Sequence, residues 1–527
     1  MQKPGWIQRL LSKHRLFVAG VFVFAAIAHV PYLAPGGPSA CHPKPLFVSI
    51  DEGTVLYDSF RITSGEVMYR DFFEFQGPVF YHIYGGLFAI TGPSLTAARA
   101  LNLLVTALTA TLIALLVAQI LGTAAGAGAA AVHVCLLVPM YPFAYPHWLA
   151  EAFAFAGIYL LVTRYGHPSR ELACGICLGL CAFTIQSLGL PILGACMVVL
   201  AIPGLAQRIW KEAWIHPLRL FGGALLGIFP FIIYLGLAGG LDQMWYSTVE
   251  WVFKHYPEGQ KDAVMEGYGA YLDTFLRLHK EVGQPWRALA TTTLQLVKFL
   301  PVFTICSIIV TIVQCSINRW RRPTDYASLT IGTAAIAGSA SLFLGITRVD
   351  IVHIAFLGGF GLCGAAVVIH PLLTWKSALR LPVAATWLFV AILVIANFTT
   401  KTVMTYGASR EMKGWRGEIL KLGIASWIDT NLGPNERIVS AACGGLQYLY
   451  IRRSAVGFTF LPFNTPKYYS NEQWQKLGGQ ILKILPPVVE VTEEQWLQIT
   501  QRTPELKGMY RLVNNHFLMR EGFTPVK

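Results

Sequence analysis

The feature that most constrains this chain is a series of long apolar stretches, each close to the length that crosses a lipid bilayer. Residues 101–121, 221–238 and 381–398 each approach the ~20 apolar residues that a spanning helix needs. Of the 527 residues, 54% are hydrophobic and only 13% are charged, whereas soluble chains carry about 25% charged residues. One such stretch could be a core helix, but a series of them predicts a polytopic α-helical membrane protein.

The loops between the stretches orient the chain. Lys and Arg cluster in alternate short loops, and such residues collect on the cytoplasmic side of a membrane. We therefore expect a cytoplasmic N-terminus, an uncleaved first helix, and a net charge of +13 that reflects topology rather than nucleic-acid binding. Within 170–204 we expect a break at Ser187–Gly189 that separates two short helices. The expected spans, about eleven, are 14–34, 95–121, 124–142, 147–164, 170–187, 189–204, 217–238, 291–316, 326–346, 351–369 and 381–399.

Three regions lie outside these spans, and the topology places all of them on the outer face: 35–94, 239–290 and 400–527. Long loops of this kind tend to be functional. The first should contain short helices lying in the membrane interface, and the tail, which mixes strand-like and helical patterns, should form a small α/β domain beside a transmembrane domain of residues 1–399. The expected loop helices are 53–64 and 78–91, the tail strands 437–441 and 488–491, and the tail helices 415–430 and 471–484.

The first outer loop carries two adjacent acids, Asp51 and Glu52, at the level of the membrane surface. A carboxylate there can act as a general base toward a hydroxyl or an amine. The alternative is a solvated acid or a helix N-cap, since Asp51 precedes a plausible helix start. The sequence leaves open which of the two acids would be the base.

A second polar pair, His147 and Glu151, lies four residues apart at the start of the expected fourth span, on one helix face. An ionisable residue within a span is by default a functional hypothesis. The alternative is that the two residues merely pair with each other. A metal site would need further ligands from elsewhere, which the sequence does not identify.

A third group follows the expected ninth span: Arg348, Asp350 and His353. Arg is a natural partner for phosphate, although a local ion pair in a turn would look the same. Gln186 could add a hydrogen bond near the outer surface or a helix-packing contact. Loop 239–290 is basic and aromatic, which suits anionic lipid headgroups or sugars but also a solvated face.

Several of these motifs, taken together, resemble the GT-C superfamily of membrane glycosyltransferases over roughly residues 10–400. The likeness is to the bacterial branch of protein O-mannosyltransferase-like enzymes, the lipid A aminoarabinose transferase and the lipopolysaccharide galacturonosyltransferases. The residues that carry it are Asp51-Glu52-Gly53, Gly65-x-x-x-Tyr69-Arg70-Asp71-Phe72, Gly77-Pro78, Gly92-x-Ser94 with Arg99, and Arg348-x-Asp350-x-x-His353.

The resemblance implies transfer of a sugar, with inversion, from a polyprenyl-phosphate carrier to a lipid, glycan or protein acceptor outside a bacterial inner membrane. By this likeness Asp51 is the general base or orients the acceptor. Arg348 holds the lipid phosphate, with Arg61 and Arg70 as further candidates beside Tyr69. Some family members bind a divalent metal. A phosphate leaving group needs positive charge but no nucleotide loop, and we find none.

Two other functions compete with glycosyl transfer. A secondary transporter also needs many spans and intramembrane acids, but it usually has paired halves and broken helices near the midplane, and we see no repeat. A non-catalytic scaffold or lipid-binding protein would use the outer domain to hold a partner. Cys41 and Cys443 are expected to face the outside, where they could form a disulfide.

Overall fold

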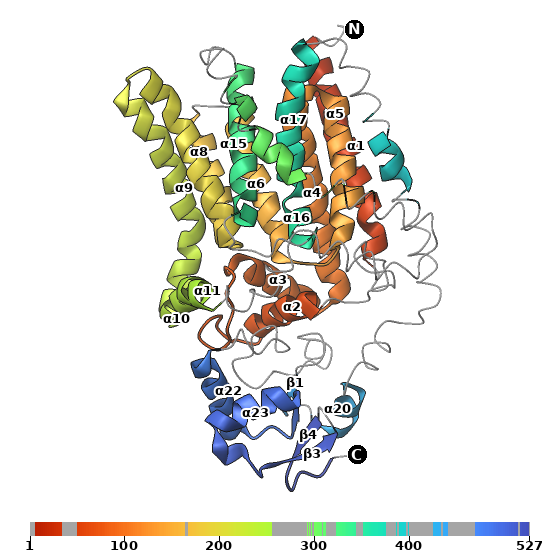
Figure 1. Ribbon diagram of the computed structural model, residues 1–527, viewed down its shortest axis with the longest axis vertical. Helices are drawn as coiled ribbons and strands as arrows, with labels where there is room; N and C mark the ends of the chain where they lie inside the picture. The colour runs from red at the N-terminus through yellow and green to blue at the C-terminus, as the bar shows by residue number, and fades with distance from the viewer. Residues whose placement is uncertain are drawn as a thin grey trace.

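The chain folds into a helical bundle with a small α/β domain at one end (Figure 1). The structure is a computed structural model that describes residues 6–33, 50–163, 167–255, 323–343, 351–375, 425–433, 436–440, 470–514 and 517–525, with scattered residues in 292–313 and 386–399. Cys41, Cys443, Arg348 and Asp350 lie outside the described residues.

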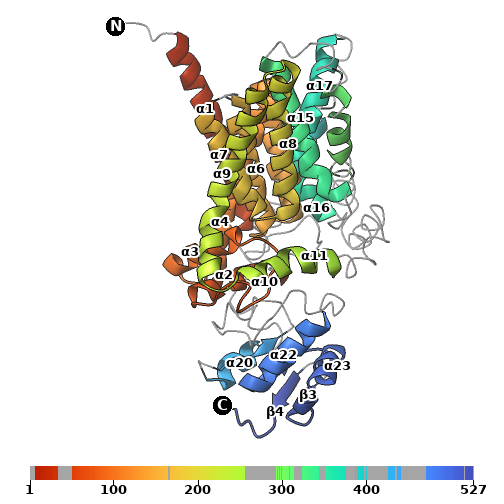
Figure 2. The same cartoon turned by 90° about the vertical axis from the view of Figure 1, so that its left-hand side faces the viewer.

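The bundle is built from long helices that run roughly side by side (Figures 1 and 2). After α5 the chain continues through one π turn, His133–Leu137, and one 3-10 turn, Val138–Met140. The described bundle helices are α1 (Trp6–His29), α4 (Leu95–Leu121), α5 (Thr123–Val132), α6 (Pro146–Thr163), α7 (Pro168–Ala182), α8 (Gln186–Ala206), α9 (Trp210–Leu237), α15 (Pro323–Phe343) and α17 (Gly358–Trp375).

Several of these helices have the length and composition of membrane spans. Shorter apolar helices accompany them, including Ala327–Ala340 and Gly358–Leu373. The prediction of a multi-pass membrane protein is therefore supported, whereas the count of eleven spans is not confirmed. Within the described residues the five segments that meet the length and composition of a span are His14–Tyr32, Leu95–Leu121, Thr123–Met140, Gln186–Ala206 and Trp210–Leu237.

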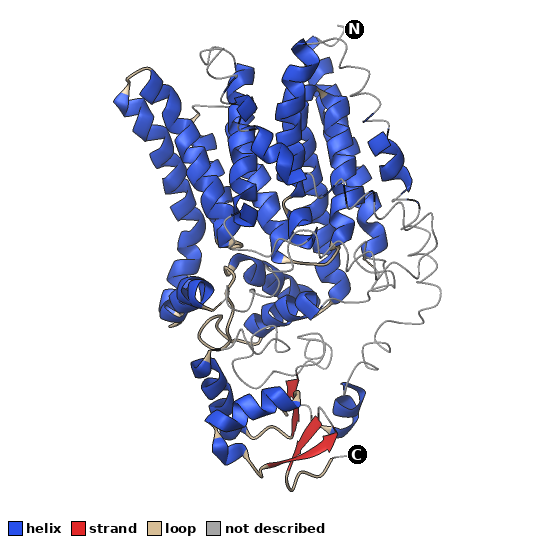
Figure 3. Cartoon of the chain, viewed as in Figure 1, coloured by secondary structure: helices blue, strands red, loops and turns tan. Residues whose placement is uncertain are grey.

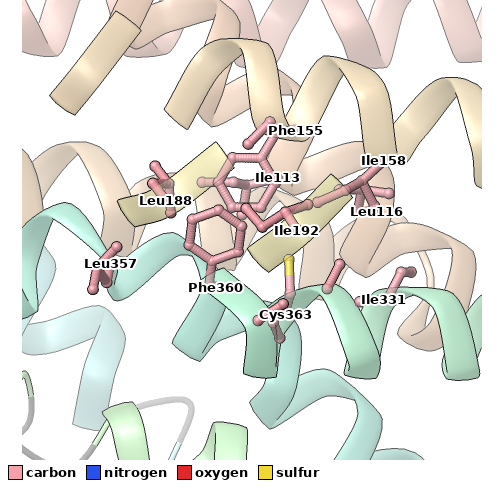
Figure 4. Packing of buried hydrophobic residues seen from close by; sticks show 14 of the residues in the cluster. Ile113, Leu116, Phe155, Ile158, Leu188, Ile192, Ile331, Leu357, Phe360 and Cys363 are labelled. Atoms are coloured by element: carbon pink, nitrogen blue, oxygen red, sulfur yellow. The ribbon is translucent and has the colours of Figure 1, made fainter. Parts of the chain in front are cut away.

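Side chains from several helices fill the core of the bundle (Figure 4). The rings of Phe155 on α6 and Phe360 on α17 stack at 4.5 Å between centroids. Helices α7 and α9 approach more closely still, because glycines face backbone: a Cβ at Gly175 would lie 2.0 Å from the Leu220 carbonyl oxygen. Small residues allow this kind of close contact between membrane helices.

Two predicted helix boundaries were wrong. The chain breaks at Phe183–Ile185 rather than at Ser187–Gly189, so Gln186 begins α8 instead of ending the preceding span. The reason is long-range, because the carbonyls of Phe183 and Thr184 accept hydrogen bonds from Val79 and Gly77 of the first outer loop, each at 3.2 Å. The expected span 351–369 is likewise divided into α16 (Ile351–Phe356) and α17, which continues to Trp375.

A layer of shorter helices lies across one end of the bundle (Figure 2). Helices α2 (Ile50–Thr63) and α3 (Val79–Thr91) coincide with the two interfacial helices expected in the first outer loop. The second outer loop begins with α10 (Leu241–Trp245), a π turn (Tyr246–Glu250) and α11 (Trp251–Lys254). This layer separates the bundle from the C-terminal domain.

The tail forms the expected α/β domain (Figure 3). Its four described strands have the order β1-β2-β4-β3, with β1 parallel to β2 and the other neighbours antiparallel. Helices α22 and α23 each begin with a capping box, at Ser470 and Thr492. The elements are α20 (Ala425–Asn431), β1 (Val439–Ser440), α22 (Asn471–Ile484), β2 (Val488–Glu490), α23 (Glu493–Arg502), a 3-10 turn (Pro504–Leu506), β3 (Tyr510–Asn514) and β4 (Phe517–Arg520).

Both outer loops pack against the C-terminal domain. Phe73 and Trp251 are buried in one apolar cluster with Trp474 of α22. The Trp251 indole N–H donates a hydrogen bond to the Gln473 side-chain oxygen at 3.1 Å. In a second contact with this domain, Tyr57 of α2 lies in an apolar cluster with residues of α20 and β2.

Candidate functional site

The two adjacent acids occupy the first turn of α2, where the helix dipole favours negative charge. Asp51 is partly buried, and the Tyr141 hydroxyl donates a hydrogen bond to its Oδ2 atom at 3.1 Å. Neighbouring residues on a helix do not share a face, so Glu52 points elsewhere. Asp51 therefore presents its carboxylate toward the segment that links α5 to α6.

Glu52 is fully buried and forms an ion pair with Arg99 of α4. The Arg99 Nε and Nη2 atoms donate to the two carboxylate oxygens at 3.0 and 2.6 Å. The Ala144 backbone N–H donates to Oε1 at 3.0 Å, and the Arg99 guanidinium lies 5.3 Å from the Phe143 ring centroid. Glu52 thus ties α2 to α4 and to the 141–145 segment.

An aromatic cluster next to Asp51 brings two predicted site histidines together. His147 stacks on Phe356, with ring centroids 4.5 Å apart, and its ring lies 5.8 Å from that of His353. Tyr145 stacks against His147, and Tyr141 contacts both Tyr145 and Phe356 edge-on. Shared aromatic neighbours therefore link Asp51 of α2, His147 of α6 and His353 of α16.

Glu151 lies one turn below His147 and is fully buried. Within the described residues its carboxylate oxygens have no side-chain partner, and they face the backbone of Gly359, where an added Cβ would lie 2.3 Å from Oε1. His147 and Glu151 do not form the pair that their spacing allowed. Within the described residues no three His, Cys, Asp or Glu side chains lie close enough to hold a metal ion.

Arg61 is buried inside the first outer loop among acids. Its guanidinium bonds Glu66 at 2.8 and 2.6 Å, lies 3.7 Å from Asp58, and faces the Phe72 ring at 4.5 Å. Burial raises the pKa of Asp58 well above its usual range. These contacts give Arg61 the geometry of a loop-stabilising residue.

Tyr69 and Arg70 fix the shape of the same loop. Tyr69 has φ +70°, a conformation uncommon outside glycine, and its buried hydroxyl donates to the Gln76 carbonyl at 2.6 Å. Arg70 bonds Asp71 and also donates to the Ala238 carbonyl at 3.0 Å, which joins the first outer loop to the end of α9. The hydrogen bonds from Arg70 hold the pKa of Asp71 below its usual value.

The first outer loop also contains a buried acid, Glu74, and it is contacted by Gln186 of α8. The Glu74 Oε1 atom accepts hydrogen bonds from the backbone N–H groups of Phe75 and Gln76 at 2.8 and 3.1 Å. Burial nevertheless raises the pKa of Glu74 to about 7. The Gln186 side chain donates to the Phe75 carbonyl at 3.0 Å, so it holds the loop against α8.

The basic residues expected in the second outer loop are described only in part. Lys254 is exposed and lies 3.4 Å from Glu250, and the His255 ring lies 6.3 Å from that of Trp251. The remaining basic residues of that loop, at 261, 277, 279, 280 and 287, lie outside the described residues.

No protein-family model matches the sequence, and no curated protein does either. Solved structures do. The apo crystal structure of the Archaeoglobus fulgidus oligosaccharyltransferase aligns with a TM-score of 0.53 and 11% identity, over 94% of this chain and 73% of that one. Its complex with zinc and sulfate gives 0.51 and 12%, over 93% and 71%. Both are GT-C glycosyltransferases.

This chain has the GT-C fold. The resemblance drawn from the sequence motifs is therefore confirmed at the level of fold. ArnT from Cupriavidus metallidurans bound to undecaprenyl phosphate matches over 96% of this chain and 98% of that one, with 13% identity and a TM-score of 0.44, which is too low to add to the assignment.

Within this GT-C fold the aromatic residues of the cluster were missed by reading the sequence. Tyr141, Tyr145 and Phe356 carry no charge, and aromatic residues near a span end are commonly interface anchors. The signal that could have found the first two is that each directly precedes a proline, Pro142 or Pro146, in the short segment before His147.

Proposed function

We propose that the chain is a glycosyltransferase that moves a sugar from a polyprenyl-phosphate carrier to an acceptor on the outer side of a bacterial inner membrane, with inversion at the anomeric carbon. The observation that carries the proposal is the arrangement around Asp51: a partly buried carboxylate held by Tyr141 beside a cluster that contains His147 and His353. The GT-C fold supports the reaction class, while the sugar and the acceptor are left open.

In this mechanism Asp51 is the general base. Its carboxylate accepts the proton of the acceptor hydroxyl or amine as that group attacks the anomeric carbon, and the bond from that carbon to the phosphate oxygen breaks. Attack from the face opposite the leaving phosphate inverts the configuration. The Tyr141 hydrogen bond to Oδ2 orients the carboxylate toward the segment from which the acceptor would be approached.

Glu52 has a different role in the proposal. Its two oxygens are engaged by Arg99 and Ala144, so it positions α2 and thereby Asp51. Of the other predicted site residues, Arg61, Tyr69, Arg70 and Gln186 shape the outer loop rather than touch substrate. The last of these contacts the Phe75 carbonyl.

The leaving phosphate needs a cation, and we propose Arg348 for that role, next to Asp350 and directly before α16 in sequence. His147 and His353 are suited to hydrogen bonds with sugar hydroxyls or phosphate oxygens. Tyr145, which is partly exposed, adds ring surface on which the CH groups of a sugar can pack, and the buried Phe356 supports the rings of Tyr145 and His147. Glu151 is completely buried one helical turn after His147 and faces the backbone of α17, which suits a supporting role behind the cluster.

Sugar transfer from a panel of synthetic polyprenyl-phosphate sugars by the purified protein in lipid tests the proposal. Asp51→Asn should lower kcat by about 100-fold or more, the usual contribution of a general base, with the melting temperature unchanged. Asp242→Asn is the matched control, because Asp242 is also an acid in the first turn of an outer helix, but it is exposed. Equal turnover of Asp51→Asn and wild type would remove Asp51 from the mechanism. Absence of transfer from every donor would favour the transporter alternative.

A further inference from the structure

The helical segment that opens the second outer loop, Leu241–Lys254, has two faces of opposite character. It comprises α10, a π turn and α11. The side chains of Ser247 and Trp251 are completely buried, whereas Trp245 and Phe253 are 59% and 70% exposed. The exposed aromatic face therefore needs a partner other than the one that covers the buried face.

The buried face packs against the C-terminal domain. Trp251 donates its indole N–H to Gln473 of α22, and its ring contacts Phe73 edge-on, with centroids 5.1 Å apart. Tyr246 and Val252 pack against the same cluster. This face is therefore fully used within the chain.

The position of the exposed face is set by α9. This helix has 28 residues, which is ~42 Å at about 1.5 Å per residue, and most of its apolar surface is not covered by other parts of the protein. Leu237, the last residue of α9, is 87% exposed, and only three residues separate it from the start of α10. Trp245, the first of the exposed aromatics, thus follows eight residues after the exposed end of this helix.

The turn between α9 and α10 is fixed rather than free. Gly239 has φ +73°, which favours glycine, and Arg70 donates to the Ala238 carbonyl at 3.0 Å. A Cβ at Gly240 would lie 3.0 Å from the Met68 carbonyl oxygen. Figure 2 shows the result: α10 and α11 cross the end of α9 and lie between the bundle and the C-terminal domain.

We propose that Leu241–Lys254 is an interfacial membrane anchor. Its Trp245–Phe253 face lies in the headgroup region of the leaflet on the side of the C-terminal domain, while the opposite face holds that domain through Trp251. Two observations support lipid as the occupant. The exposed face continues the lipid-facing surface of α9, and tryptophan concentrates at membrane–water interfaces.

The polar residues of the segment agree with this orientation. Asp242 and Lys254 are exposed, the latter 65% at its side chain, as expected for groups that remain in the hydrated headgroup layer. The consequence is mechanical: the anchor fixes the height of the C-terminal domain above the membrane. The inference rests on the fold and the membrane and is independent of the proposed reaction.

A photo-cross-linking experiment tests the anchor. Benzoylphenylalanine replaces Trp245 or Phe253, one at a time, in the full chain in nanodiscs, and adducts are identified by mass spectrometry after irradiation. Leu512 on β3 is the matched control, because it is 64% exposed but belongs to the C-terminal domain, away from α9. Lipid adducts at 245 and 253, at least fivefold above those at 512, are the expected result.

Two outcomes would overturn the proposal. Equal lipid labelling at all three positions would mean that the segment has no preferred contact with the bilayer. Adducts from 245 and 253 to a second polypeptide would make the face a protein interface instead. Since both sites are exposed, each variant should unfold at the wild-type temperature, and using two positions independently separates a local defect from a wrong assignment.

Discussion

The ion pair between Glu52 and Arg99 offers a test of whether the second acid of the pair is structural. Replacing Glu52 with Gln preserves its shape but leaves the Arg99 guanidinium buried without an anionic partner. Arg99 is 2% exposed and Glu52 is completely buried, so water cannot replace the lost partner.

The expected loss is large. Breaking a buried ion pair by removing one partner costs about 3–5 kcal/mol, mostly because an uncompensated charge is left behind. The geometry here supports the full range, since two guanidinium donors reach the two carboxylate oxygens at 3.0 and 2.6 Å. Replacing Arg99 with Met as well removes that charge, so the double variant should regain most of the lost stability.

Thermal unfolding of the purified protein, followed by tryptophan fluorescence, measures the effect for both single variants and the double variant. Asp71→Asn serves as the control, because it disrupts a pair with Arg70 whose side chains are 31% and 46% exposed. Such pairs contribute about 0–1 kcal/mol. Sugar transfer is measured on the same samples.

The reasoning would be refuted by a Glu52→Gln variant that unfolds at the wild-type temperature and yet loses transfer. That result would make Glu52 a chemical group rather than a positioning residue. A double variant that is stable and retains transfer would exclude Glu52 as the base and leave Asp51 in that role.

Three further changes have definite expectations. Gly223→Ala should destabilise the bundle by about 1–3 kcal/mol, because the new Cβ would lie 2.1 Å from the Leu172 carbonyl oxygen. Gly222→Ala is the control, because there is open space at that position, and thermal unfolding compares the two variants. Burial raises the pKa of Glu74 to about 7, so the stability of the wild type relative to Glu74→Gln should fall as pH rises from about 4.5 to about 7. The total loss should be roughly 3 kcal/mol, with no further change at higher pH. Melting temperatures of both proteins across this pH range measure it, and a difference that does not depend on pH would contradict a buried, neutral carboxyl. Trp251→Ala should release the C-terminal domain and speed proteolysis between the bundle and α22, while Trp245→Ala should leave the cleavage rate unchanged.

The sequence predicted what depends on local patterns. Hydropathy located the apolar helices, and aromatic and polar residues at helical spacing located α2 and α3. Ionisable residues that are costly in a membrane drew attention to His147 and His353, which the structure brings together. These signals work because lipid permits few alternatives to an apolar helix.

Long-range contacts decided the rest. The break between α7 and α8 is set by hydrogen bonds from Gly77 and Val79, more than a hundred residues earlier in the chain. The partner of Glu52 lies 47 residues away, so nothing near Glu52 in the sequence indicates that its carboxylate forms an ion pair. The short strands β3 and β4 escaped notice because they carry no strong alternation and acquire their register only in the folded sheet.

The two adjacent acids illustrate how a helix start can assign different roles to similar residues. Successive side chains on α2 diverge, so one carboxylate enters the protein and the other faces the aromatic cluster. The inward acid joins α2, α4 and the 141–145 segment through Arg99 and Ala144. The same segment supplies Tyr141, which holds the outward acid. Movement of the ion pair would therefore displace both Asp51 and its orienting hydroxyl, which is why we expect Glu52 variants to alter transfer through stability and position rather than through the proton itself.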